Sequence, residues 1–369
     1  MRIVADENMP LLGELFGAQG EVVALPGRAI TPAVVRDADV LLVRSVTRVD
    51  AGLLADSAVR FVGSATSGCD HVDRDWLAAA GIEFAHAPGC NAGAVVQYVL
   101  AVCCALRPRW RELTVGILGC GAVGGRLWRL LAALGVRCLT CDPLLPAGAL
   151  PVPVALDRLL GEADILCLHV PLTEDGPHAT HHLLDAGRLA RLKPGALLIN
   201  AARGAVVDNA ALRRRLVEGR ELSVALDVWE GEPAIDLDLW RLVDLGTPHI
   251  AGYSREGREN GSRAVYEAFR AWRGLPPPAA PRREALRPLA LAAGADALAA
   301  AVLASFDVRA EQRRMAAALA VGGDPATAFD ALRRSCPERR EFEHFRVVGP
   351  CGPELARDLR RLGFAVADR

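Results

Sequence analysis

The sequence predicts an α/β protein that has two doubly wound parallel-sheet domains and a small α+β domain at its C-terminal end. Two series of short apolar runs, over residues 2–85 and 113–246, alternate with helical segments. This alternation is typical of the βα units that build parallel sheets. A proline-rich stretch over residues 275–281 then separates both series from a tail of different composition, as expected of a linker.

Length and composition limit the classes of function. A chain of 369 residues is expected to hold two or three domains. Its 51% hydrophobic and 24% charged residues indicate a soluble globular protein with a substantial core. The 43 basic and 44 acidic residues balance to a net charge of −1, so bulk electrostatics attract no polyanion. We therefore expect no nucleic-acid partner.

The expected location is the cytoplasm. No uncharged apolar run reaches the length of about 18 residues that a membrane span needs, so no membrane partner is expected. The first six residues begin a strand and do not form a signal peptide. The ten cysteines are scattered without a disulfide framework, which indicates free thiols in a reducing compartment.

The first series of apolar runs predicts a flavodoxin-like substrate domain. Its expected strands are Arg2–Ala5, Glu21–Leu25, Val40–Val43, Arg60–Ser64 and Ile82–Ala85. Helices are expected over Ala92–Leu106 and Glu259–Arg273, one on each side of the second series. We therefore predict a substrate-binding domain of residues 1–91 and 253–274, into which a domain of residues 92–252 is inserted. The site is expected in the cleft between them, where closure excludes water.

The second series contains the motif of a dinucleotide-binding Rossmann domain. The strand Leu113–Leu118 leads into Gly119-Cys120-Gly121-Ala122-Val123-Gly124, and a helix with apolar residues three and four apart follows. The first glycine permits a tight turn, the second lets the backbone approach a pyrophosphate, and the third lets helix pack on strand. The first turn of the helix offers backbone N–H groups to the phosphates.

An acidic residue completes this motif. The strand Val136–Cys141 ends at Asp142, about 18 residues beyond the third glycine, near the spacing of the dinucleotide fingerprint. Its carboxylate can accept hydrogen bonds from both ribose hydroxyls, and its charge repels a 2′-phosphate. The sequence therefore predicts NAD as the cofactor in preference to NADP. The alternative is a glycine-rich turn that binds no ligand.

Three ionisable residues each follow a short apolar run of the second series. The runs are Ala196–Asn200, Ser223–Leu226 and Val243–Gly246, and the residues that follow them are Arg203, Glu232 and His249. Because ligands bind beyond the carboxyl ends of parallel strands, we expect all three side chains at one rim. A cation that holds an anion, and a carboxylate that tunes an imidazole, suit proton transfer beside an anionic substrate. We therefore predict an enzyme with these catalytic residues.

Each catalytic candidate has a structural alternative. Arg203 could form an ion pair at the rim, and Glu232 could cap a helix that begins near Pro233. His249 could be a hydrogen-bonded histidine of the core. These alternatives differ from the catalytic hypothesis in where the side chains point.

Two groups of residues suggest metal chemistry, which we do not expect. Cys138 and Cys141 lie inside a predicted strand, where residues three apart face opposite sides, and no second pair accompanies them. His178, His181 and His182 gather in a polar loop without a nearby cysteine or a firm carboxylate partner. A solvated loop is the simpler interpretation, so no metal is predicted.

The tail, residues 281–369, predicts a small domain that forms contacts between subunits. An alanine-rich helix is expected around Pro288–Phe306, and two short strands over Phe345–Val348 and Phe364–Ala367. No catalytic constellation is visible in this segment.

Taken together, these motifs resemble the NAD-dependent D-2-hydroxyacid dehydrogenases. The resemblance rests on the glycine motif with Asp142 and on Asn200–Gly204, Asp227–Pro233 and Pro248–Gly252. Further segments resemble one branch of this family, which acts on a phosphorylated 2-hydroxy acid. They are Ala5–Pro10, Val43–Val49, Gly68–Asp73, Pro88–Ala92 and Gly252–Gly257, and in the tail Asp307–Arg309, Phe329–Arg333 and Arg339–Glu341.

The resemblance implies hydride transfer from C2 of the substrate to NAD. Arg203 would hold the substrate carboxylate and C2 oxygen, and His249 would take the hydroxyl proton. Glu232 would orient the imidazole and stabilise its charged form. By the same resemblance, the tail is a dimerisation domain and the enzyme is a homodimer.

The resemblance also implies binding residues. The substrate contacts are Ser45, Thr66 and Tyr253, and the further cofactor contacts are Val170, Ala202, Asp227 and Gly252. At Val170 the family has a hydroxyl residue, so only a backbone contact is expected there. The residues that bind the substrate phosphate stay open, with Arg44 and Arg48 as candidates.

Two rival functions remain at this point. Another member of the family, such as a phosphoglycerate dehydrogenase or a hydroxypyruvate reductase, would share the motifs of the cofactor domain. The tail shows no clear βαββαβ regulatory repeat of the kind that many phosphoglycerate dehydrogenases carry. The second rival is a non-enzymatic NAD-sensing protein, which would have no need to retain the arginine, glutamate and histidine together.

Overall fold

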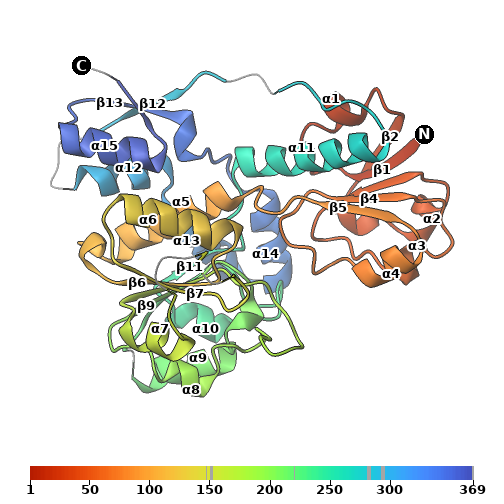
Figure 1. The fold of residues 1–369 in the computed structure, drawn as a ribbon. Helices are drawn as coiled ribbons and strands as arrows, with labels where there is room; N and C mark the ends of the chain where they lie inside the picture. Colours follow the sequence, from red (N-terminus) through yellow and green to blue (C-terminus); the bar gives the residue numbers. More distant parts are fainter. Residues whose placement is uncertain (147, 150–152, 220, 281–283, 292–295, 368–369) are drawn as a thin grey trace. The chain divides into compact units, whose positions relative to one another are not determined.

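The computed structural model describes residues 1–146, 148–149, 153–219, 221–280, 284–291 and 296–367. These residues divide into two compact units. The first holds Met1–Asn91 and the segment that begins at Ser254 and includes the long helix α11. The second holds Ala92–Tyr253 and the segment that begins at Glu284. Figure 1 labels most of the helices and strands of both units.

The described part of the first unit is built on a five-stranded parallel sheet in the order β2-β1-β3-β4-β5. The strands are β1 (Arg2–Asp6), β2 (Glu21–Leu25), β3 (Val40–Val43), β4 (Phe61–Ser64) and β5 (Glu83–His86). The order reverses between β1 and β3, which is the flavodoxin-like arrangement. The predicted fold class of this unit is confirmed.

Helices cover both faces of this sheet (Figure 1). One face carries α2 (Pro32–Val35), α3 (Ala51–Leu54) and α4 (Arg74–Ala79), and the other carries α1 (Leu12–Phe16) and α11 (Arg255–Trp272). Because successive strand residues point to opposite faces, Leu41 joins the first core and Leu42 the second. β3 is therefore buried along its whole length, and its sequence is a continuous apolar run.

Helix α11 begins earlier than predicted. We expected its start at Glu259, but it begins at Arg255 because the Ser254 hydroxyl accepts a hydrogen bond from the Gly257 N–H at 2.8 Å. This N-cap satisfies one of the backbone donors that the first turn leaves without a partner. Its apolar face, with Val265 and Phe269, then packs on β4 and β5.

In the described part of the second unit, six parallel strands form a sheet in the order β11-β10-β9-β8-β6-β7. They are β6 (Val115–Leu118), β7 (Cys138–Cys141), β8 (Ile165–Leu168), β9 (Leu197–Asn200), β10 (Ser223–Leu226) and β11 (Leu245–Gly246). An isolated parallel bridge between Thr140 and Pro153 extends the sheet beyond β7. With that bridge the order is that of a Rossmann domain, which confirms the prediction.

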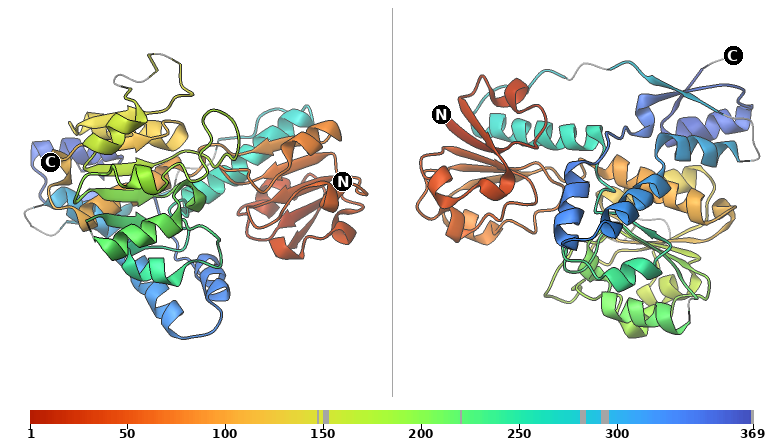
Figure 2. Two further views of the ribbon diagram at one scale, coloured as in Figure 1. Left: turned by 90° about the horizontal axis from the view of Figure 1, so that it is seen from below. Right: turned by 180° about the vertical axis from the view of Figure 1, so that it is seen from behind.

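The two faces of this sheet form separate cores. α5 (Ala92–Leu106) and α6 (Ala122–Ala133) cover one face, and α7 (Leu156–Glu162), α8 (Ala186–Leu189), α9 (Asn209–Glu218) and α10 (Leu237–Leu242) cover the other (Figures 1 and 2). Along β9, Leu197 and Ile199 join the core under α5, whereas Leu198 joins the opposite core. Among the described residues, no helix combines the length and the apolar character that crossing a membrane requires.

The tail packs on both faces of the same sheet. Its elements are β12 (Arg287–Ala290), α12 (Ala297–Ser305), α13 (Val308–Ala320), α14 (Pro325–Arg334), β13 (Phe345–Val348), α15 (Pro353–Leu362) and β14 (Ala365–Val366). Val302 and Phe306 join the core that contains α5, and Met315 and Phe329 join the opposite core. Helix α13 also contacts the edge strand β11. The described tail is thus part of the second compact unit, although it carries a small parallel sheet of its own, β12-β13-β14.

One prediction for the tail is wrong. The helix expected around Pro288–Phe306 begins only at Ala297, and Arg287–Ala290 forms the edge strand β12. An edge strand tolerates Pro288, because a missing N–H on its outer side costs no ladder bond. Residues 292–295 of the expected helix, and the predicted domain start at residue 281, lie outside the described residues.

We predict that Gly124→Ala destabilises the second unit. An alanine Cβ at this position would lie 2.0 Å from the Gly119 carbonyl oxygen and 3.1 Å from Ile117 Cγ2. The backbone must move to relieve this overlap, at a cost of about 1–3 kcal/mol in the free energy of unfolding. Urea denaturation measures the change.

The control is Gly161→Ala in α7, where a Cβ meets no heavy atom within 4 Å. Alanine is the better helix former, so this variant should be equal to or more stable than the parent by up to about 1 kcal/mol. Equal effects of the two substitutions would contradict the close approach at Gly124.

Candidate active site

Three loops at the carboxyl ends of neighbouring strands carry the predicted catalytic residues. Arg203 follows β9, Glu232 lies in the loop after β10, and His249 lies in the loop after β11. Since β9, β10 and β11 are adjacent parallel strands, their ends meet at one edge of the sheet. The structure therefore brings these three loops together, as the sequence predicted.

His249 and Glu232 form a close pair. The Nδ1 atom of His249 lies 2.6 Å from Oε2 of Glu232, and their side chains are 31% and 19% exposed. Burial alone would raise the pKa of Glu232, but it is lowered by the His249 charge, two hydrogen bonds and, more weakly, the charge of Arg333. One of these bonds comes from the Trp229 N–H at 2.7 Å. Among the described residues, Nε2 of His249 has no hydrogen-bond partner.

The backbone of His249 adopts an uncommon conformation. Its φ is +56°, in the left-handed region that residues with a side chain rarely occupy. Its N–H donates to the Asp227 carbonyl oxygen at 2.7 Å. Strain of this kind persists only where the surroundings determine the conformation, and it gathers at functional sites.

The buried side chain of Asp227 holds the His249 loop in this conformation. Its carboxylate is 1% exposed and accepts bonds, among the described residues, from the Thr247 hydroxyl at 2.7 Å and from the Ile250 and Ala251 N–H groups at 2.8 Å each. Thr247 also lies 2.8 Å from the hydroxyl of the buried Tyr98 on α5. These contacts anchor the loop of His249 to the core on both sides of the histidine.

Backbone contacts lock the Arg203 loop against the Glu232 loop. Gly204 approaches the Trp229 backbone so closely that a Cβ would lie 1.9 Å from its carbonyl carbon. The side chain of Asn200 accepts from the Ala202 N–H at 3.1 Å and donates to the Arg203 carbonyl oxygen at 2.9 Å. Trp229 in turn donates from Nε1 to the Thr247 carbonyl oxygen at 2.9 Å. The three loops therefore form one interlocked arrangement.

The structural alternative for Glu232 is wrong. No helix begins near Pro233 in the described chain; the next helix, α10, begins at Leu237 and is capped by Asp236. Glu232 instead turns toward His249, and Pro233 follows it through a cis peptide bond.

The glycine motif lies between β6 and α6 and fits a dinucleotide. Gly119 has φ +85°, and a Cβ there would meet Val170 Cγ1 at 2.7 Å. Gly121 is the N-cap of α6, and both Gly121 and Ala122 are exposed. Among the described residues, no heavy atom lies within 4 Å of a Cβ placed on Gly121. Open space in front of a helix N-terminus, with Val123 in its first turn, suits a pyrophosphate.

Asp142 is held by backbone groups at the end of β7. Its carboxylate oxygens accept bonds from the Cys120 N–H at 2.8 Å and the Leu144 N–H at 3.1 Å. Each oxygen keeps a second acceptor position, so the orientation that the backbone fixes is compatible with ribose hydroxyls. The other predicted cofactor residues also lie in this unit: Val170 after β8, Ala202 after β9, and Asp227 and Gly252 on either side of His249.

The predicted substrate residues are divided between the units. Ser45 follows β3 and Thr66 follows β4, so both lie at the carboxyl edge of the first sheet. The Thr66 hydroxyl donates to the Gly68 carbonyl oxygen at 2.7 Å and lies 2.7 Å from the hydroxyl of Ser64. Tyr253 belongs to the second unit and follows the His249 loop directly.

Two arginines of the tail reach this loop, and sequence reasoning assigned them no part in the site. The Arg333 guanidinium lies 5.6 Å from the centre of the Tyr253 ring. Arg339 is buried, donates to the carbonyl oxygens of Ala251 and Ala94, and lies over the Phe306 ring. No sequence pattern indicates these contacts, because the arginines come from a segment that is distant in the chain.

The histidine loop has a carboxylate partner that the sequence did not reveal. Nε2 of His182 lies 2.6 Å from Oε1 of Glu230, and potential ligand atoms of His181, His182 and Glu230 all lie within 4.8 Å of one another. The two imidazole rings are stacked, 4.1 Å apart and only 20° from parallel. A metal must lie near the plane of each ligating ring, about 2 Å from its nitrogen, and two such planes do not meet there. The observed arrangement is a hydrogen-bonded pair.

The ten cysteines, all among the described residues, form no disulfide bonds. Burial raises the pKa of Cys138 to about 12.

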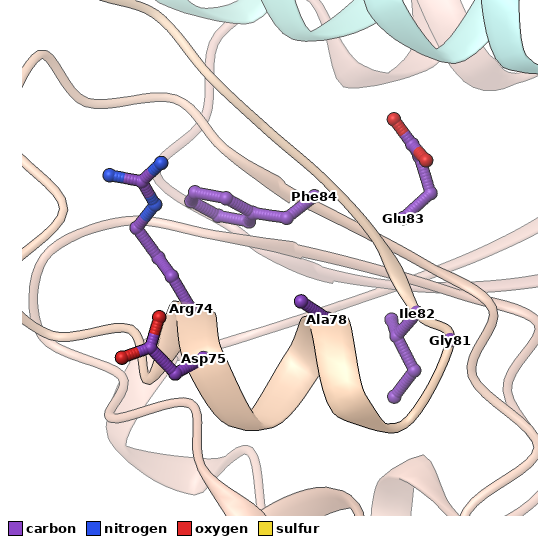
Figure 3. A pocket seen from close by; sticks show the side chains of 7 residues that line it. All are labelled: Arg74, Asp75, Ala78, Gly81, Ile82, Glu83 and Phe84. Carbon is purple, nitrogen blue, oxygen red and sulfur yellow. The ribbon is translucent and has the colours of Figure 1, made fainter.

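In the first unit, a hollow of about 480 Å³ lies between α4 and β5. Figure 3 shows Arg74 and Asp75 projecting from α4 and Phe84 from β5 at this hollow. None of the predicted site residues lines it.

Comparison with known proteins identifies the family. Residues 105–251 match the model of the D-isomer specific 2-hydroxyacid dehydrogenase NAD-binding domain, and residues 277–363 match a domain of unknown function. The chain is 48% identical to an erythronate-4-phosphate dehydrogenase of Pseudomonas paraeruginosa, over 98% of this chain and 99% of that protein. It is 45% identical to one of Teredinibacter turnerae, over 99% of each chain. The chain belongs to the D-2-hydroxyacid dehydrogenase family.

Solved structures agree with this assignment. A D-lactate dehydrogenase from Aquifex aeolicus in complex with NAD and lactic acid is 25% identical, with a TM-score of 0.64 over 74% of this chain and 96% of that chain. A D-lactate dehydrogenase from Treponema pallidum is 26% identical, with a TM-score of 0.58 over 75% of this chain and 98% of that chain. The protein is an NAD-dependent dehydrogenase, and the resemblance inferred from its motifs is confirmed.

We predict that Asp227→Asn destabilises the His249 loop. An amide can accept through only one of its two terminal atoms, so at least one donor of the loop then faces an NH₂ group. A buried donor left unsatisfied costs about 1–3 kcal/mol, measured as a lower free energy of unfolding in urea.

Asp238→Asn on the exposed surface of α10 is the control, and it should stay within about 0.5 kcal/mol of the parent. A parent-like stability of Asp227→Asn would show that this carboxylate does not hold the loop.

Proposed function

We propose that this dehydrogenase oxidises 4-phospho-D-erythronate to 3-hydroxy-2-oxo-4-phosphooxybutanoate with NAD, a step of pyridoxal 5′-phosphate biosynthesis. The observation that carries the proposal is identity of 45–48% over almost the whole chain, tail included, to erythronate-4-phosphate dehydrogenases. The geometry of the site supports it, because an acid–base pair lies on loops interlocked with the loop of an arginine.

The proposed catalytic roles are those that the family resemblance implies, and the contact between His249 and Glu232 supports two of them. Arg203 binds the substrate carboxylate and the C2 oxygen, since a guanidinium can hold a carboxylate through two parallel hydrogen bonds. His249 accepts the C2 hydroxyl proton at Nε2, the ring nitrogen that Glu232 leaves available. Glu232 fixes the ring through Nδ1 and stabilises the imidazolium that forms. Bound NAD supplies the acceptor for the hydride that leaves C2.

General acid–base assistance of this kind accelerates a reaction by about 10²–10⁴-fold. At 1.36 kcal/mol for each factor of ten, His249 is expected to lower the barrier by about 3–5 kcal/mol. The remaining acceleration comes from orienting the substrate against the cofactor.

The binding residues are also proposals. Gly119, Gly121, Ala122, Val123 and Gly124 receive the pyrophosphate, and Asp142 receives the adenine ribose. Asp227 and Gly252 flank the nicotinamide, and Val170 and Ala202 line the cofactor cleft. Ser45, Thr66 and Tyr253 contact the substrate, and Arg44 and Arg48, which follow β3 in the sequence, are candidates for its phosphate.

We further propose that the protein acts as a homodimer in the cytoplasm. The tail is the expected site of subunit contact, and scattered cysteines that form no disulfide among the described residues suit a reducing compartment. Size-exclusion chromatography with light scattering tests the dimer.

The deciding experiment compares substrates. NADH formation is measured with 4-phosphoerythronate and with 3-phosphoglycerate at matched concentrations. We expect the higher kcat/KM with 4-phosphoerythronate. A higher value with 3-phosphoglycerate would replace the proposed substrate by that of another family member, and the absence of turnover with any 2-hydroxy acid would favour an NAD-sensing role.

For the base, we predict that His249→Ala lowers kcat by at least about 100-fold while the Kd for NAD stays within a few-fold of the parent. The substitution removes the proton acceptor and leaves the glycine motif intact. Steady-state kinetics and a fluorescence titration with NAD measure the two quantities. Unchanged turnover would mean that another group is the base.

For the cofactor, we predict that Asp142→Ala relaxes the preference for NAD over NADP, because the charge that repels a 2′-phosphate is lost. The same change removes acceptors of the Cys120 and Leu144 N–H groups. Asp142→Asn therefore serves as a second variant that keeps the side-chain shape. The ratio of kcat/KM for the two cofactors measures the preference; an unchanged ratio in both variants would refute the ribose assignment.

A further inference from the structure

The tail places two arginines on the segment that follows His249. Arg339 is buried and donates to the Ala251 carbonyl oxygen, and Arg333, near the end of α14, lies over the ring of Tyr253. Helix α14 is fixed by its apolar residues Phe329 and Leu332, which join the core of the NAD-binding unit. The position of the Arg333 guanidinium is therefore set by packing within a single compact unit.

Arg333 is charged in a partly buried place without a direct ion pair. No carboxylate of the described residues lies within salt-bridge distance of it, and its Nε is buried without a hydrogen-bond acceptor. Burial opposes the charge, yet the pKa of Arg333 is raised, because anionic or electron-rich groups surround it. These groups are Tyr253, Glu232 and Asp227.

We propose that the C-terminal module completes the active site of its own chain, with Arg333 as a positioning residue that holds the Tyr253 ring and places a positive charge beside the Glu232–His249 pair. The guanidinium carbon lies over the Tyr253 ring, 5.6 Å from its centre, and the Arg333 charge contributes weakly to the lowered pKa of Glu232. This inference rests on the proposed function, since it assigns Arg333 to the reaction in which that pair transfers a proton. It gives a role in catalysis to a segment that matches a domain of unknown function.

Comparison with two neighbouring arginines distinguishes the proposed role of Arg333 from simple packing. Arg334 is next on the same helix and is exposed, so it shares the helix but not the site. Arg339 is enclosed and bonded to two backbone carbonyls, which is the environment of a structural anchor. Arg333, by contrast, lies over the ring of Tyr253, a proposed substrate residue, and its charge contributes to the lowered pKa of Glu232.

The charge has a predictable effect on pH dependence. The groups that lower the pKa of Glu232 against the effect of its burial are His249, the Trp229 N–H and, most weakly, Arg333. A nearby positive charge makes protonation of Glu232 less favourable, and a protonated Glu232 no longer stabilises the imidazolium that forms during oxidation. Removing the Arg333 charge therefore moves the acid limb of the kcat/KM profile to higher pH.

The experiment uses the full-length protein with NAD and 4-phosphoerythronate. Arg333→Met should lower kcat/KM at least tenfold and move the acid limb upward, while the Kd for NAD stays within a few-fold. Arg333→Lys keeps the charge and should restore the acid limb, although it loses the planar guanidinium that lies over the Tyr253 ring. Arg334→Met is the matched control and should behave like the parent in every measurement.

The outcomes separate the inference from the proposed function. Activity of the parent on 4-phosphoerythronate tests the function, and the comparison among variants tests Arg333. If Arg333→Met only lowers the melting temperature, or lowers kcat/KM with an unmoved acid limb, Arg333 is a packing residue and the inference is wrong. An Arg334→Met variant that is equally impaired would also overturn it.

Discussion

The buried carboxylate of Asp227 is the constraint on which the active site depends. It accepts hydrogen bonds from the Thr247 hydroxyl and from the N–H groups of Ile250 and Ala251, which lie on both sides of His249. Holding a histidine at φ +56° costs of the order of 1–3 kcal/mol. Hydrogen bonds to a charged acceptor contribute about 1.5–3 kcal/mol each, so the carboxylate offsets the strain. The imidazole is thereby fixed before any ligand arrives.

Contacts between neighbouring loops also explain how Arg203, Glu232 and His249, which lie far apart in the sequence, come to one edge of the sheet. Parallel strands β9, β10 and β11 end at one edge, but strand ends alone leave loops free to diverge. Close contacts prevent this divergence. Gly204 packs directly against the Trp229 backbone, and the Trp229 indole N–H donates a hydrogen bond to the Thr247 carbonyl oxygen. A side chain at position 204 would separate the Arg203 loop from the Glu232 loop. Glycine there is a requirement of the site and not only of the turn.

The sequence predicted those features that depend on local patterns. Buried parallel strands such as Val40–Val43 appear as apolar runs, and the glycine motif has a fixed order of strand, turn and helix. Both sheets, the NAD-binding domain and the meeting of the loops after β9, β10 and β11 were therefore predictable. Edge strand β12 was not, because a short edge strand with a proline lacks a distinctive pattern. Contacts over long separations, such as Arg339 with Ala251 at 88 residues or His182 with Glu230 at 48, leave no local pattern.

Docking of the tail and its contribution to the site have one physical origin. Helix α12, Ala297–Ser305, is apolar along almost its whole length, and it buries Leu298, Ala301 and Val302 while Ala300 and Ala304 stay exposed. Its buried side needs apolar partners, and α12 packs on α5 and α15. The apolar burial that stabilises the tail therefore also holds α13 and α14 against the large sheet, with Met315 and Phe329 in its core. A change that loosens this packing is expected to displace Arg333 as well, so the proposed role of Arg333 ties the stability of the tail to the proposed proton transfer at His249.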